Sequence, residues 1–169
     1  MLNRRFFLGT AAAAALTGCA RTENMSKLYS GPKITHIEVL KSQRIMRLWA
    51  NGEVLKDYEV DLGFAPNGPK QFEGDGKTPE GQYFINRRNP ESRFFLSLGI
   101  SYPNARDIAR ARAVGRDPGG DIFIHGRTPA RIKSQFAPDW TAGCIALSNA
   151  EMREVYWKVE VGTPITIRP

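Results

Sequence analysis

Short apolar runs, separated by loops rich in glycine and proline, are the feature that most limits how this chain can fold. Two long loops of this kind are expected at 63–80 and 126–143. The runs between them are shorter than a typical helix and suit strands. Apolar residues make up 41% of the 169-residue chain, which is enough for the packed core of one domain. We therefore expect a single, mainly β domain.

Alternation of apolar and polar residues predicts a β-hairpin at the start of this domain. The runs 44–50 and 53–62 flank Asn51-Gly52. This dipeptide favours a type I′ turn, because both central residues of that turn need positive φ. Further strands are expected where β-branched and aromatic residues gather, at 34–39, 81–88, 94–100, 121–125 and 164–168.

Two helices are expected from their capping residues. Asn104 is expected to cap a helix that runs to about Val114, and Asn149 a helix that runs to about Lys158. About seven short strands with two helices at their edges predict a β-sandwich or open barrel.

The N-terminal segment has the layout of an export signal. Arg4 and Arg5 precede Phe6-Phe7-Leu8 and a short alanine-rich run, and the paired arginines resemble a twin-arginine signal. The apolar run is shorter than the roughly 20 residues that span a bilayer. Export through the general secretory route is the alternative.

Cys19 lies where a signal peptidase would cleave. The run Leu16-Thr17-Gly18-Cys19 resembles a lipobox, in which the cysteine is acylated and becomes the mature N-terminus. We expect a signal peptide at 1–18, a lipid on Cys19, a tether at 19–32 and a catalytic domain at 33–169. This predicts a periplasmic, lipid-anchored protein, and Ala20 in place of aspartate favours the outer membrane. An ordinary signal followed by a chance cysteine is the alternative.

The charge and the histidine count narrow the range of partners. A formal charge of +7 favours anionic partners, but no RNA-binding motif of alternating basic and aromatic residues is present, so we expect no nucleic acid. The chain has two histidines, His36 and His125, without metal-ligand spacing. We therefore expect neither a metal nor a cofactor, and His36 is expected to be an ordinary strand residue.

Cys144 is a candidate nucleophile. If Cys19 carries lipid, Cys144 has no partner for a disulfide in an oxidising compartment. His125, at the end of a predicted strand, could take the thiol proton and form a thiolate–imidazolium pair. Gly143 would allow close approach of substrate, with the amides of Gly143 and Cys144 free to face an oxyanion. A buried, inert cysteine and a structural histidine are the alternative.

These residues fit the signature of a known family. The run His125-Gly126, followed after a loop by Thr141-Ala142-Gly143-Cys144-Ile145, resembles that of the L,D-transpeptidase (YkuD-domain) family. The segment 74–81 (GDGKTPEG) resembles another motif of the family, and the resemblance covers about 33–168. It implies a β-sandwich-like catalytic domain with Cys144 as nucleophile and His125 as general base. It also implies that the backbone carbonyl of Gly126 orients the imidazole.

The resemblance also implies a reaction on peptidoglycan. The thiolate would attack the amide after meso-diaminopimelate in a stem peptide, and an amine of a second stem would resolve the acyl-enzyme. Ala142 and Ala146 stand where many members carry histidine and arginine. A branch with such a reduced signature is associated with amidase chemistry. Hydrolysis of peptidoglycan or lipoprotein–peptidoglycan amides is therefore one alternative, and a non-catalytic wall-binding lipoprotein is the other.

Three further residues are candidates for substrate contact. Arg127 could bind a stem-peptide carboxylate as a bidentate donor, with Arg131 and Lys133 in the same loop more simply explained as a solvated basic face. Trp140 could form a wall of the cleft or a packing anchor. Thr141 could hydrogen-bond within the active loop or cap its turn.

Overall fold

The computed structural model describes residues 30–128 and 138–169. Eight strands and a few short helices make up this part of the chain, so the predicted mainly β fold is confirmed. The expected signal peptide, the lipid on Cys19 and all but the end of the tether lie outside the described residues. The elements are β1 (His36–Leu40), η2 (Lys41–Gln43), β2 (Ile45–Ala50), β3 (Glu53–Glu59), β4 (Gly81–Ser92), β5 (Phe95–Ile100), α1 (Ala105–Ala113), β6 (Phe123–His125), β7 (Ile145–Ala146), α3 (Asn149–Lys158) and β8 (Pro164–Arg168).

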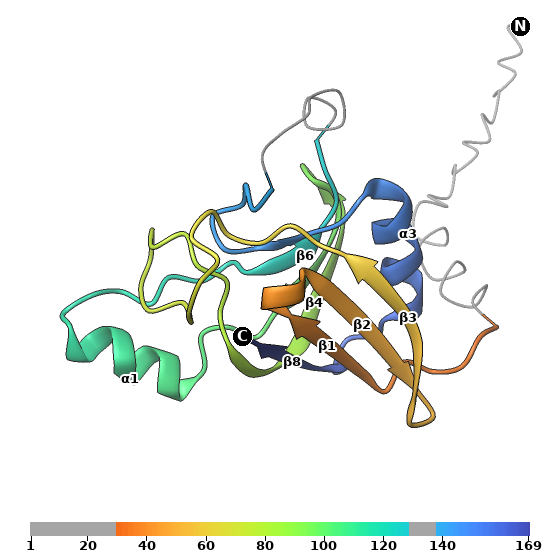
Figure 1. The fold of residues 1–169 in the computed structure, drawn as a ribbon, viewed down its shortest axis with the longest axis horizontal. Coiled ribbons are helices and arrows are strands. Elements are labelled where there is room, and N and C mark those ends of the chain that lie inside the picture. Colours follow the sequence, from red (N-terminus) through yellow and green to blue (C-terminus); the bar gives the residue numbers. More distant parts are fainter. Residues whose placement is uncertain (1–29, 129–137) are drawn as a thin grey trace, which may run out of the picture.

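The strands form one mixed sheet in the order β3-β2-β1-β8-β4-β5-β6-β7. The long strand β4 belongs to both halves, because its first residues pair with β8 and its later residues pair with β5. Figure 1 shows β4 curving from one half of the sheet to the other, with α1 and α3 at opposite sides of the view. No helix in the described ranges is long and apolar enough to cross a membrane.

The two edge regions of the sheet lie against each other without a continuous ladder, as in a partly open barrel. Isolated bridges join Asp61, just after β3, to Ala146 of β7, and Gly63 to Thr141. Asp61 and Ala146 exchange two backbone hydrogen bonds of 3.0 and 2.8 Å. We call this junction the seam. It brings the segment that follows β3 against the segment that carries Cys144.

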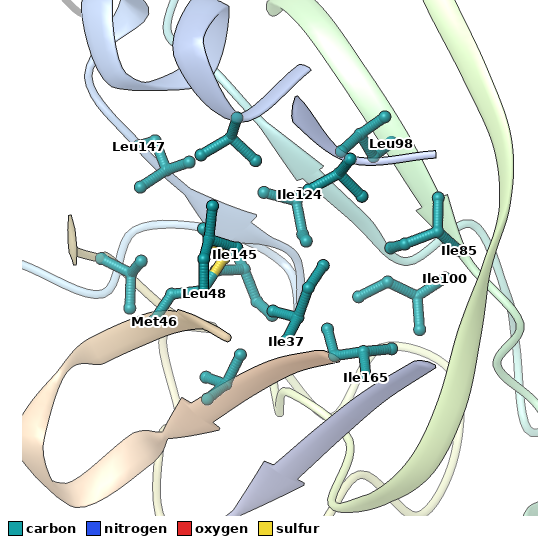
Figure 2. Close-up of a cluster of buried hydrophobic side chains, with 14 of the residues drawn as sticks. Ile37, Met46, Leu48, Ile85, Leu98, Ile100, Ile124, Ile145, Leu147 and Ile165 are labelled. Carbon is teal, nitrogen blue, oxygen red and sulfur yellow. The ribbon is translucent and has the colours of Figure 1, made fainter. Parts of the chain in front are cut away.

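The predicted hairpin is confirmed. β2 and β3 pair antiparallel, and both Asn51 (φ 52°) and Gly52 (φ 82°) lie in the left-handed region. Alternate residues of β1 and β2 point inward, and Ile37 and Leu48 have no exposed surface. Figure 2 shows the core between the two halves of the sheet, where the largest aliphatic side chains converge: Ile37, Met46, Leu48, Ile85, Leu98, Ile100, Ile124, Ile145, Leu147 and Ile165.

Both helices begin at a capping box. Asn104 caps α1 as predicted, and its side chain accepts from the Arg106 and Asp107 amides. For α3 the prediction is wrong by one residue, because Ser148 is the N-cap and Asn149 is the first helical residue. The Oδ1 atom of Asn149 instead accepts a 2.6 Å hydrogen bond from the Arg127 amide. A side chain thus ties α3 to the strand end that carries His125.

Ser148→Ala is expected to lower the free energy of unfolding by about 1 kcal/mol, because the Glu151 amide loses its acceptor. The measurement is urea unfolding followed by circular dichroism. Ser42→Ala is a suitable control, since the Ser42 hydroxyl makes only an exposed 3.2 Å bond to the Pro169 carbonyl. Equal stability of the two variants would contradict the capping role.

Candidate active site

Cys144 and His125 line the same pocket, so the structure brings the two predicted catalytic residues together. The volume of this pocket is about 270 Å³. The turn between β4 and β5 forms one wall, and β6 with the segment before it forms another. The remaining lining residues are Asn89, Ser92, Arg93, Phe94, Ser97, Asp121 and Phe123. Cys144 is partly exposed at this pocket and is not enclosed in the aliphatic core.

The segment that carries Cys144 is fixed by close backbone packing. Gly143, with φ at 132°, adopts a conformation that side chains rarely allow. A Cβ at this position would lie 2.6 Å from the carbonyl oxygen of Lys77, so only glycine fits. The Cys144 thiol donates to the carbonyl of Asp121 at 3.5 Å. Cys144 is thus held between the loop at 63–80 and the start of β6.

The imidazole of His125 is held by its own backbone and by two aromatic rings. Its Nδ1 atom lies 2.6 Å from the carbonyl oxygen of Gly126. Phe94 packs on the ring at 4.7 Å between centroids, and Trp140 meets it edge-on at 5.7 Å. When Nδ1 carries the proton and donates it to Gly126, Nε2 is left with the lone pair that a general base needs.

Burial shifts both groups of the pair toward their neutral forms. It raises the pKa of the Cys144 thiol, against the opposing effects of a Phe123 backbone hydrogen bond and the Lys70 charge. Burial likewise lowers the pKa of His125, with the Gly126 hydrogen bond acting in the opposite direction. Both shifts oppose the charge separation of the expected thiolate–imidazolium pair. A neutral imidazole that lines the same pocket as a neutral thiol can still accept its proton as attack occurs.

The prediction for the Gly143 amide needs correction. This N–H donates to Thr141 Oγ1 at 3.1 Å, so it is already engaged and is not free to face an oxyanion. The Thr141 hydroxyl in turn donates to the Cys144 carbonyl at 2.8 Å. Thr141 is buried and shapes the turn that carries Cys144, and it does not line the pocket. Its observed contacts are those of the turn-capping alternative.

Arg127 and Trp140 flank the site without lining the pocket. Arg127 forms an ion pair with Asp61 at 3.0 Å, and the Trp140 indole N–H donates to the same carboxylate at 2.9 Å. Arg131 and Lys133 lie outside the described residues. The arginine that does line the pocket is Arg93, which sequence reasoning missed. In the sequence, the one indication of this role is that Arg93 falls between two predicted strands.

Fold and pocket together define a class: a small, mainly β domain with a cysteine and a histidine at one cleft. The family model of the YkuD L,D-transpeptidase catalytic domain matches residues 34–167. The chain therefore belongs to the L,D-transpeptidase (YkuD) family.

Known proteins similar to this chain fit that assignment. YafK of Escherichia coli (strain K12) is 30% identical over 156 residues, which cover 89% of this chain and 56% of YafK. The helical cell shape determining protein Pgp2 of Campylobacter jejuni (K307A mutant) is 26% identical, with a TM-score of 0.64 over 83% of this chain and 48% of Pgp2. The L,D-transpeptidase of Mycobacterium smegmatis shares the fold at 19% identity, with a TM-score of 0.54 over 82% of this chain and 60% of that one. The chain thus spans about half the length of YafK and Pgp2.

Proposed function

We propose that this domain is a peptidoglycan L,D-transpeptidase that uses Cys144 as nucleophile and His125 as general base. One observation carries the proposal: both side chains line one pocket, and the Gly126 carbonyl holds Nδ1 of the imidazole. Here a backbone carbonyl orients the imidazole, as a carboxylate does in a Ser-His-Asp triad. An exported, periplasmic location with a lipid on Cys19 belongs to the same proposal and rests on the N-terminal sequence.

The proposed reaction is acyl transfer in two steps. The Cys144 sulfur attacks the amide carbonyl of meso-diaminopimelate in the donor stem, and His125 takes the thiol proton. The C–N bond breaks, the departing amine receives that proton, and a thioester remains. An amine of a second stem then attacks the thioester, and its proton returns through His125 to the cysteine.

Hydrolysis is the second candidate, since two positions offer no polar contact for an amine acceptor. Ala142 carries only an exposed methyl group, and Ala146 is fully buried. Water would then resolve the thioester and release a trimmed stem or a freed lipoprotein. The likeness to Pgp2, the helical cell shape determining protein of Campylobacter jejuni, supports a role in cell shape for either reaction.

Incubation with purified muropeptides, followed by mass spectrometry, tests the proposal. Crosslinked dimers are the result expected of a transpeptidase, and trimmed stems are the result expected of a hydrolase. A Cys144→Ala preparation identifies products of contaminating enzymes. Unchanged muropeptides, together with no acylation of Cys144 by a carbapenem, would leave the non-catalytic wall-binding function.

Arg93 is expected to bind a substrate carboxylate in place of the predicted Arg127. Arg93 is exposed at the pocket, whereas Arg127 is already paired with Asp61. Arg93→Gln should raise KM for a meso-diaminopimelate stem about tenfold and change kcat little, because a charge-assisted hydrogen bond is lost. Steady-state kinetics measure both constants, and Arg93→Lys should recover part of the loss. An unchanged KM would exclude this contact.

A further inference from the structure

Asp61 lies at the seam, next to the active site but outside the pocket. Its backbone pairs with Ala146, two residues after the nucleophile. Its carboxylate is mostly buried, with 17% of the side chain exposed. A buried carboxylate costs free energy unless it is hydrogen-bonded, so its partners show what the residue does.

The carboxylate of Asp61 contacts both ends of the loop that separates His125 from Cys144. Oδ2 accepts from Arg127 Nη2 at 3.0 Å and from the Trp140 indole N–H at 2.9 Å. Oδ1 is 3.4 Å from the Asp139 amide. One side chain therefore joins the residue that follows His125-Gly126 to the residues that precede the nucleophile turn.

The contact with Trp140 reaches the imidazole. An indole N–H that is removed from water needs an acceptor, and here Asp61 supplies it. The same indole packs edge-on against His125 and lies 6.2 Å from the ring of Phe94, which covers the imidazole from another direction. Asp61 thereby fixes one wall against which the His125 ring rests.

A second ion pair anchors the same loop end. Arg44 binds the Asp139 carboxylate through Nε and Nη2, at 3.0 and 2.7 Å, and Asp139 Oδ1 accepts from the Leu62 amide. Arg127 has less support, since its buried Nε has no partner within the described part of the chain. The position of Arg127 therefore depends on Asp61, whereas the position of Asp139 is also held by Arg44 and the Leu62 amide.

We propose that Asp61 is a positioning residue for the reaction: its carboxylate holds Arg127 and Trp140 so that the His125 imidazole keeps its orientation in the pocket, with Nδ1 on the Gly126 carbonyl. The inference rests on the proposed function for its kinetic consequence. Its structural part, the constraint on the imidazole, stands on the contacts alone. A small displacement of a catalytic group is enough to reduce a rate about 10²-fold.

Asp61→Asn is the first variant to test, because it keeps the shape and one acceptor oxygen but removes the charge that pairs with Arg127. It should lower kcat at least about tenfold and leave KM within about twofold. Asp57→Asn is the matched control. Asp57 lies on β3 and forms a two-point ion pair with Arg47 at 2.7 and 2.8 Å, exposed and outside the pocket. The control should leave both constants unchanged.

Trp140→Phe gives a second variant in case Asp61→Asn does not fold. It keeps a ring against His125 and removes the indole donor, so kcat should fall in the same direction. The ¹⁵N signals of the His125 ring provide a readout that needs no substrate: the preference for a proton on Nδ1 should weaken in both variants and stay unchanged in Asp57→Asn.

Each outcome of these experiments has a stated meaning. Wild-type kcat and unchanged His125 ring signals in Asp61→Asn would overturn the proposal. Equal losses in Asp57→Asn would also overturn it, because they would show that loss of the exposed Arg47–Asp57 ion pair has the same effect as loss of the Asp61–Arg127 pair. If the wild type does not turn over muropeptides, the proposed function fails, while the ring signals still decide whether Asp61 constrains His125.

Discussion

Replacing Cys144 by alanine is expected to abolish turnover of muropeptides, with kcat lower by at least about 10⁴-fold. The reason is that Cys144 carries the one thiol among the side chains that line the pocket, and the hydroxyls of Ser92 and Ser97 are far weaker nucleophiles. The reaction is followed by mass spectrometry of the crosslinked or trimmed products. The alanine variant should still bind a stem peptide, since a smaller side chain leaves the pocket open.

Two controls keep this result specific to the chemistry. Cys144→Ser retains the size of the side chain and should be nearly as inactive, because a hydroxyl is a far weaker nucleophile than a thiol beside the same base. Circular dichroism should show that both variants keep the wild-type fold. Turnover by Cys144→Ala above one-hundredth of the wild-type rate would rule out the covalent mechanism.

Removal of the imidazole has the second largest expected effect. His125→Gln should lower kcat/KM by about 10²- to 10⁴-fold, the usual contribution of a general base. Steady-state kinetics on a muropeptide donor measure the loss. His36→Gln is the matched control, because His36 lies on β1 and does not line the pocket. A similar loss in both variants would indicate a structural effect of histidine replacement.

The pH profile checks the same assignment. Burial lowers the pKa of His125 below the ordinary value of 6.5. The neutral, proton-accepting imidazole therefore persists to more acidic pH, and kcat/KM should fall only as pH drops through that lowered pKa. Burial raises the pKa of the Cys144 thiol, so its alkylation by iodoacetamide without substrate should increase only at alkaline pH. A thiolate that persists below pH 6 would show that the resting pair is ionic.

Features encoded by neighbouring residues were predictable from the sequence. The Asn51-Gly52 turn needs only two residues with positive φ, and the Asn104 cap needs only a side chain within reach of two amides. Cys144 and His125 were predicted as a pair because the residue types suit one reaction and their local motifs resemble a family signature, and the structure places both at one pocket. Family membership is confirmed by the match over 34–167.

Features that depend on distant pairing were missed. β7 has only two residues, and no periodicity can be detected at that length. β4 was expected to end at 88 but continues to Ser92. Pro90 is tolerated because it falls in the irregularity between the paired residues Asn89 and Ser92. The Asp61 contacts span more than 60 residues along the chain, and nothing near Asp61 in the sequence indicates them.

The position of β8 has a consequence for the order of folding. β8 lies between β1 and β4, and it pairs Ile37 with Ile165, residues from the two ends of the described domain. A ribosome must therefore synthesise the chain as far as residue 168 before β8 can link β1 to β4. Contacts of such long sequence separation form slowly. Until they do, β1 and β4 lack the strand that lies between them, and a truncation before 164 would leave that gap in the sheet.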